Sequence, residues 1–353
     1  MVSTPFVTVP PSAYGGTELV VHALTRALER AGHEVVLFAT GDSRARRLEA
    51  LFARPVWPPD HYAELLHSRF AAREIARGGF DVVHAHLPAM LAFADELAAP
   101  TVYTLHHAAQ PALSRFYAHA GGAALVAISR RQAELCDPPA THVVHHGLDP
   151  ELYPAAGPGG DQAFFLGRLS HCKAPELAIE AARLAGLPLV VAGQTHSYDN
   201  PPGWEEEVLG PALAQPHVRW LEEADLAEKR RLFARSRALL VPLRWEEPFG
   251  LVMIEALLAG CPVIASPLGA APEIVEDGRT GFLVRNVKEM AEALRRAGGL
   301  DRRAIQVRGR ALFSADRMAQ GYLAVYRAAA LEARAPVLQP GEEGDGPWTT
   351  LAQ

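Results

Sequence analysis

The sequence has few cysteines, no long apolar run and no excess of positive charge. Its three cysteines, Cys136, Cys172 and Cys261, are far apart and form no C-x-x-C pair, which favours reduced thiols over disulfides. No apolar run is long enough to cross a bilayer, and the first residues lack a signal-peptide pattern. The formal charge of −6 gives no general attraction to nucleic acid or anionic lipid. We therefore expect a soluble cytoplasmic protein that binds no nucleic acid and associates with membranes weakly at most.

Two nucleotide and metal signatures are also missing. The first predicted strand–loop–helix unit lacks the G-x-G-x-x-G spacing of a dinucleotide fingerprint. Several histidines lie near predicted strand ends, where open parallel sheets bind ligands: His84, His86, His106, His107, His145 and His146. The cysteine or carboxylate spacing that would complete a zinc site is absent, so no metal is expected.

The length of 353 residues predicts two domains of about 150 residues each. A segment rich in proline and glycine, residues 154–160, marks the boundary. On each side, short apolar strands alternate with helical patterns, which is typical of doubly wound parallel α/β sheets. We expect an N-terminal domain, a C-terminal domain, a helix that packs back on the N-terminal domain, and a disordered tail: residues 1–156, 161–314, 315–335 and 336–353.

Apolar periodicity places the individual elements. Strands are predicted at 2–9 (shorter than its neighbours), 35–39, 81–86, 101–106, 123–129, 142–145, 163–166, 189–192, 217–221, 238–242 and 262–265. Helices are predicted at 17–31, 225–237, 287–297 and 315–332, with another that ends at 185. Residues 43–57 mix four arginines with apolar side chains. They are interpreted as a solvated helix face, with a patch against an acceptor or membrane as the alternative.

Residues 246–260 lie between two apolar strands and organise the C-terminal domain. Pro248 and Gly250 break the backbone, so Glu247 is expected in a turn and Glu255 about two turns along a helix. Such a turn exposes backbone N–H groups that attract an anion. If helical, the span separates the two carboxylates by roughly 12 Å, more than the roughly 5 Å of a retaining glycosidase pair. We interpret them as hydroxyl-binding groups on one ligand, and the alternative is two solvated surface acids.

Four motifs, in order along the chain, resemble those of the retaining glycosyltransferases of the GT-B fold, family four. They are residues 14–18, 167–173, 247–260 (a Glu-x7-Glu segment) and 277–284, and the resemblance spans about residues 1–330. It implies two Rossmann-like domains that face each other across a cleft, the N-terminal one on the acceptor side and the C-terminal one binding the nucleotide sugar. The chain departs from the family pattern at His145 and His146, where proline and asparagine are usual, and at Ala174, where glycine is common.

The resemblance assigns the phosphate-binding residues first. Arg168 and Lys173 match the pair that binds the donor diphosphate, where two cations stabilise a leaving pyrophosphate. Gly15 and Gly16 match the glycine loop that lets backbone amides approach the same phosphates.

It also assigns the residues around the ribose and the transferred sugar. Glu255 matches the acid that holds the ribose hydroxyls, and Glu247 matches the contact to the sugar. The backbone after Pro248 belongs to the same contact: Phe249, Gly250 and Leu251. His106 matches a histidine beside the donor sugar, and the adjacent His107 is the competing candidate.

The activity that the resemblance implies is transfer of a hexose from a nucleotide sugar to the hydroxyl of a small-molecule, glycan or lipid acceptor. UDP-glucose is favoured over GDP-mannose, the configuration is retained, and the donor is a co-substrate rather than a cofactor. The chain contains no D-x-D, which fits a metal-independent enzyme. The implied catalytic residues are His106, Arg168, Lys173 and Glu247. The alternatives are a non-catalytic nucleotide-sugar-binding protein and a sugar-nucleotide epimerase of the same architecture.

Overall fold

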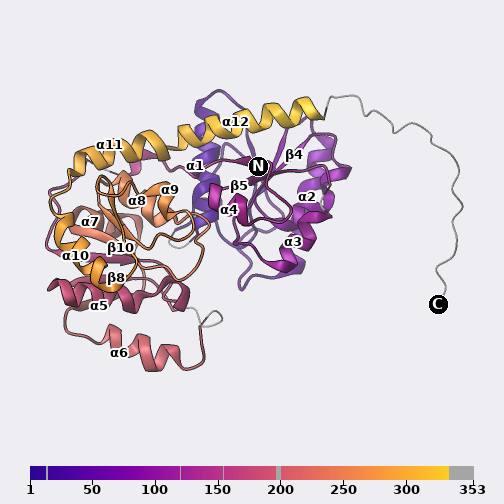
Figure 1. Cartoon of the computed structure of the whole chain (residues 1–353). Coiled ribbons are helices and arrows are strands. Elements are labelled where there is room, and N and C mark those ends of the chain that lie inside the picture. Colours follow the sequence, from indigo (N-terminus) through magenta and orange to yellow (C-terminus); the bar gives the residue numbers. More distant parts are fainter. Residues whose placement is uncertain (13–14, 120, 154, 196–199, 334–353) are drawn as a thin grey trace, which may run out of the picture.

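The computed structural model describes residues 1–12, 15–119, 121–153, 155–195 and 200–333. It contains two parallel α/β sheets, one built from strands before residue 150 and one from strands after residue 160 (Figure 1). This arrangement confirms the predicted doubly wound α/β class. Tyr14, Pro154 and the predicted tail lie outside the described residues.

The N-terminal half alternates short strands with helices. Its strands are β1 (Val36–Phe38), β2 (Arg47–Glu49), β3 (Val83–Ala85), β4 (Thr101–Thr104), β5 (Ala124–Ala127) and β6 (His142–Val143). Its helices are α1 (Gly16–Arg30), α2 (His61–Arg77), η1 (Pro88–Glu96), α3 (Pro111–Ala118), α4 (Arg130–Leu135) and η2 (Pro150–Leu152). Strands β3 to β6 pair in sequence order. Val2 bridges both Phe38 and Ala85, so the β1–β2 pair lies beside β3 in one layer.

The C-terminal half repeats the pattern around a six-stranded sheet of order β12-β11-β10-β7-β8-β9. Its strands are β7 (Gln162–Leu166), β8 (Leu189–Ala192), β9 (Val218–Leu221), β10 (Ser236–Val241), β11 (Val263–Ala265) and β12 (Gly281–Leu283). Its helices are η3 (His171–Lys173), α5 (Pro175–Ala185), η5 (Glu205–Leu209), α6 (Gly210–Leu213), α7 (Leu226–Arg235), α8 (Leu251–Leu258), α9 (Ala271–Ile274), α10 (Val287–Ala297) and α11 (Arg302–Phe313). Because β7 and β10 are neighbours, the loops at their carboxyl ends meet.

The long helix α12 (Ala315–Glu332) leaves the C-terminal half and runs along the N-terminal half (Figure 1). The Ser314 side chain accepts a hydrogen bond from the Arg317 amide, which begins the helix. Two tyrosines then anchor it on the N-terminal sheet. The Tyr322 hydroxyl lies 2.7 Å from Thr104 Oγ1, and the Tyr326 hydroxyl lies 2.7 Å from His84 Nδ1.

Two local predictions were wrong, and several helices, α2 and α11 among them, were not predicted. The expected strand at 2–9 is reduced to a single bridge at Val2, because prolines at 5 and 10 remove donors from the pairing ladder. Residues 43–57 form no helix and instead contribute β2, which pairs with β1. Helix α11 was missed, because its face carries many arginines and only a few buried residues mark its apolar stripe.

Candidate functional site

Lys173 and Glu247 form an ion pair where the β7 and β10 loops meet. Lys173 ends η3, and Glu247 stands in the loop that leads to α8. The Trp245 indole donates from Nε1 to Glu247 Oε2 at 2.9 Å, and its ring centroid lies 5.0 Å from Lys173 Nζ. Only 19% of the Lys173 side chain and 9% of the Glu247 side chain are exposed. The pair is therefore largely withdrawn from water, and sequence reasoning had not placed Trp245 beside it.

The start of α8 is shaped by glycine. Gly250 has φ +87°, and a Cβ there would lie 2.5 Å from Met253 Cε, so only glycine fits without strain. The amide of Met253 bonds to the Gly250 carbonyl, as in a helix start. Because the helix begins at Leu251, Glu255 lies about one turn along it, and the expected two turns are wrong. The loop thus presents the first N–H groups of α8 beside Glu247.

Glu255 is deeply buried, with 3% of its surface exposed. Lys229 Nζ lies 2.6 Å from Glu255 Oε1, and the Tyr153 hydroxyl donates to the same oxygen at 3.1 Å. Both partners come from outside the predicted motif. No sequence pattern indicated either partner. Lys229 is one of several charged residues on the polar helix α7.

Arg168 follows β7 in the same loop as Lys173, and its side chain is half-buried. The preceding residue, Gly167, lies against Gly193. A Cβ at Gly193 would fall 1.8 Å from the Gly167 carbonyl oxygen, so the β7 and β8 loops approach closely. The structure therefore places both predicted diphosphate cations in one loop.

The N-terminal half supplies the opposite wall. Gly15 precedes α1, and a Cβ on Gly16 would lie 3.2 Å from Leu251 Cδ1 at the start of α8. Ser129 Oγ donates to the Pro248 carbonyl at 2.8 Å. The predicted glycine loop therefore lies against the start of α8. Its contact with the donor phosphates remains a prediction.

A cluster of buried and half-buried imidazoles lies beside that wall. His86 Nδ1 lies 2.8 Å from His106 Nε2, and the His106 ring stacks on His146 with centroids 5.3 Å apart. Burial lowers the pKa of His86 and His106 well below the ordinary value, and lowers that of His146 to about 3. The His107 side chain, by contrast, is exposed. His106 is thus held as a neutral ring within the cluster.

His146 connects this cluster to the α8 loop. Its ring meets Phe249 edge-on, with centroids 5.1 Å apart. Its Nδ1 atom is buried and has no hydrogen-bond partner among the described residues. A histidine here departs from the family pattern, so no motif predicted the contact.

Two carboxylates of the C-terminal half clamp α4 of the N-terminal half. Arg131 donates to both oxygens of Glu246, at 3.0 and 3.1 Å. Glu273 accepts from the amides of Arg130 and Arg131 and from His145 Nε2, at 2.9 to 3.0 Å. Burial raises the pKa of Glu273, but these hydrogen bonds outweigh it and the pKa lies below the ordinary value. Sequence reasoning missed this clamp because its members are far apart in the chain.

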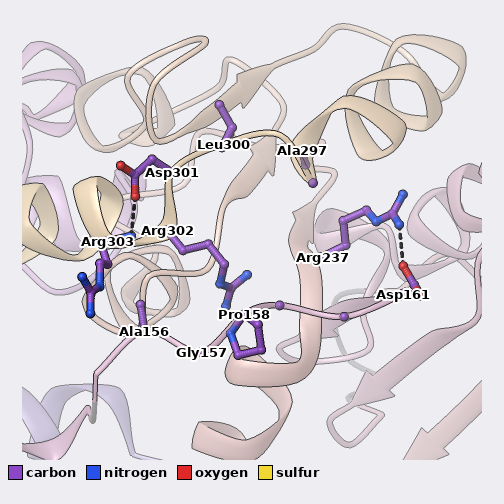
Figure 2. Close-up of a pocket in the computed structure, with 13 residues that line it drawn as sticks. Ala156, Gly157, Pro158, Asp161, Arg237, Ala297, Leu300, Asp301, Arg302 and Arg303 are labelled. Atoms are coloured by element: carbon purple, nitrogen blue, oxygen red, sulfur yellow. Dashed lines mark hydrogen bonds and ion pairs between the residues drawn. The ribbon is translucent and has the colours of Figure 1, made fainter.

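A cavity of about 570 Å³ lies elsewhere, at the glycine-rich linker (Figure 2). Arg302 donates to the carbonyls of Ser236 and Phe233 and so closes the end of α7, while Arg237 bonds to Asp161. None of the predicted site residues lines this cavity. Arg237 and Arg302 are thus accounted for by structural contacts.

The described residues show neither a metal-binding cluster nor a membrane-spanning helix. Among them, no three or more histidine, cysteine or acidic side chains are grouped so as to hold a metal ion. No helix in this part of the chain has the length and apolar character needed to span a bilayer.

Each half of the chain matches a known glycosyltransferase family model. Residues 14–152 match the Glycosyltransferase Family 4 model, and residues 160–298 match that of Glycosyl transferases group 1. A D-inositol 3-phosphate glycosyltransferase of Mycobacterium leprae (strain Br4923) is 30% identical over 309 residues, which cover 71% of this chain and 70% of that protein. A second such enzyme, of Mycobacteroides abscessus, is 30% identical over 221 residues, which cover 57% of this chain and 49% of that protein, so the chain spans about half the length of that relative.

Solved structures agree on the fold. AviGT4, a glycosyltransferase involved in avilamycin A biosynthesis, superposes with a TM-score of 0.75 at 24% identity, covering 94% of this chain and 97% of that one. Anabaena Alr3699/HepE in complex with UDP-glucose gives 0.70 at 19% identity, covering 93% and 98%. The chain therefore belongs to the family 4 glycosyltransferases (glycosyl transferases group 1) and has their GT-B fold.

Proposed function

We propose that this chain transfers a hexose from a nucleotide sugar, UDP-glucose in preference to GDP-mannose, to an acceptor hydroxyl with retention of configuration. The observation that carries the proposal is the Lys173–Glu247 pair at the carboxyl edge of β7 and β10, facing the Gly15–Gly16 loop. A cation, a carboxylate and a helix start suit a ligand that carries both phosphates and sugar hydroxyls.

Donor binding would exchange contacts within that pair. Lys173 pairs with a phosphate oxygen of the donor in place of Glu247. Glu247 then accepts hydrogen bonds from the sugar hydroxyls. Arg168 supplies the second cation on the diphosphate. Gly15 and Gly16 let the N-terminal backbone close over the phosphates, because a side chain at either position would meet Pro11 or Leu251. Glu255, held by Lys229 and Tyr153 on one oxygen, offers its other oxygen to the ribose.

The reaction then needs no covalent enzyme intermediate. The bond between the anomeric carbon and the phosphate oxygen breaks, and the acceptor oxygen bonds to the same carbon on the same face. The acceptor proton passes to the departing diphosphate. The main task of the protein is to stabilise the leaving group's charge, which Arg168, Lys173 and the first amides of α8 perform. Neutral His106 lies beside the sugar as a hydrogen-bonding group.

The relatives support this choice of chemistry. The Mycobacterium leprae relative is named a D-inositol 3-phosphate glycosyltransferase, another curated relative is an alpha-maltose-1-phosphate synthase, and one structural neighbour was solved with UDP-glucose. The first acceptor to test is therefore an inositol phosphate.

The test is a proton NMR time course with UDP-glucose and inositol 3-phosphate, with GDP-mannose as the competing donor. We expect a new α-anomeric signal from UDP-glucose and none from GDP-mannose. A β-anomeric product would refute retention. Binding of UDP-glucose without turnover across a panel of acceptors would favour the non-catalytic alternative, and a change of the donor sugar without an acceptor would favour the epimerase.

A further inference from the structure

The ring of His106 is held through its backbone and through one of its nitrogens. The Gln132 side chain donates from Nε2 to the carbonyls of Leu105 and His107, at 2.8 and 2.9 Å, which fixes the main chain on either side of His106. His86 Nδ1 lies 2.8 Å from His106 Nε2. The place of this half-buried ring is therefore set, and what it offers a ligand depends on which nitrogen carries its proton.

The thioether of Met1 determines where the proton of His86 lies. Met1 Sδ is 2.9 Å from His86 Nε2, and a thioether sulfur accepts hydrogen bonds but has no proton to donate. His86 Nε2 therefore carries a proton. The His86 ring is only 2% exposed, and burial lowers its pKa well below the ordinary value, so the ring is neutral and carries no second proton. His86 Nδ1 is thus an acceptor.

The proton of His106 is fixed by this neighbour. Because His86 Nδ1 accepts, the proton between the two rings belongs to His106 Nε2. Burial also lowers the pKa of His106 well below the ordinary value, so this ring is neutral too and its Nδ1 carries no proton. That Nδ1 forms no hydrogen bond with any residue that the structure describes, and unlike the Nδ1 of His146 it is not a buried atom without a partner. The unprotonated nitrogen is therefore accessible to a ligand.

We propose that His86 is a positioning residue that holds His106 in the Nε2–H tautomer, so that His106 Nδ1 accepts a hydrogen bond from a hydroxyl of the transferred sugar. This inference rests on the proposed function and adds to it the direction of the hydrogen bond. An unprotonated nitrogen binds a group that brings its own proton and disfavours a group that can only accept, such as a fluorine. His86 thereby selects for a free hydroxyl at the sugar position that faces His106.

The first test determines the tautomer in the free protein. The full chain, with isotopically labelled histidine nitrogens, is studied by long-range proton–nitrogen correlation NMR, and the His106 signals are assigned by their absence in His106→Asn. We expect a protonated Nε2 and an unprotonated Nδ1. In His86→Leu, which leaves no acceptor opposite His106 Nε2, both tautomers should be populated. In His86→Asn the amide oxygen can replace the ring nitrogen as acceptor, so the tautomer should be kept.

The second test measures donor binding by titration calorimetry, with UDP-glucose and with analogues in which one sugar hydroxyl at a time is replaced by fluorine. At one position the analogue should bind the wild type about fivefold more weakly than UDP-glucose, since one hydrogen bond between neutral groups is lost. At that position the difference should disappear in His86→Leu and persist in His86→Asn. Differences at the hydroxyls that Glu247 contacts should persist in both variants and so serve as the internal control.

The two tests separate this inference from the proposed function. A proton on His106 Nδ1 in the wild type would overturn the inference whatever the protein binds, as would unchanged His106 signals in His86→Leu. Fluorine effects that are the same in wild type and His86→Leu at every position would also overturn it. If the tautomer is as stated but UDP-glucose and GDP-mannose do not bind, the proposed function fails while the role of His86 stands. Thermal midpoints show whether each variant is folded, and if His86→Leu is not, the wild-type tautomer and His86→Asn decide.

Discussion

Replacing His146 with asparagine should make the protein less sensitive to acid. The His146 ring is 3% exposed, and burial lowers its pKa to about 3 from the ordinary 6.5. The unfolded chain therefore binds a proton below pH 6.5 that the folded chain does not, so stability falls as the pH falls. The slope is about 1.4 kcal/mol per pH unit for one site, which amounts to about 2 kcal/mol between pH 8 and pH 5.

The assay is urea unfolding at several pH values between 8 and 5, with the comparison made on the pH dependence and not on the absolute free energy. In His146→Asn the loss of unfolding free energy on acidification should be smaller by about 2 kcal/mol. His33→Asn is the control, because it removes an exposed imidazole that stays in water in both states. If the two halves unfold separately, the transition that carries the β3 to β6 sheet is the one to follow. An unchanged pH dependence in His146→Asn would refute the assignment of a neutral buried ring.

Four further predictions concern the proposed donor site. Lys173→Ala should reduce kcat by at least about a hundredfold with little change in the unfolding free energy, since a cation on the leaving group is lost; near-normal turnover would exclude that role. Glu255→Gln should mainly raise KM, because the ribose is bound alike in the ground state and the transition state. Glu247→Gln should mainly lower kcat, because the transferred sugar gains charge only in the transition state. The reverse pattern in steady-state kinetics contradicts the two roles. Activity should survive EDTA, and restoration by manganese after a loss would show that a metal takes part. Gly269→Ala should destabilise the protein by about 2 kcal/mol or more, because its Cβ would lie 2.2 Å from the Glu247 backbone, whereas Gly278→Ala, also at positive φ but in open space, should cost about 1 kcal/mol.

Local pattern was sufficient for much of the fold. The apolar runs at 189–192 and 263–265 are buried strands, and the helices at 287–297 and 315–332 begin and end where the periodicity places them. The two helices show an apolar period of 3.6 residues, and the two strands are short apolar runs bounded by glycine and proline. The same reasoning failed at 43–57, where the pairing of β2 with β1, a contact between distant residues, decides the conformation.

By itself, the sequence determined the family, the two-sheet architecture and the order of the Glu247, Glu255, Arg168 and Lys173 motifs. Each of these follows from how residues are spaced along the chain. Only the tertiary structure decided which groups surround them. Lys229 and Tyr153 reach Glu255 from separate elements, and the clamp on α4 joins residues more than a hundred positions apart. Such contacts depend on how two sheets and a returning helix pack together. No local period encodes that packing, so the surroundings of each predicted residue were visible only once the chain had folded.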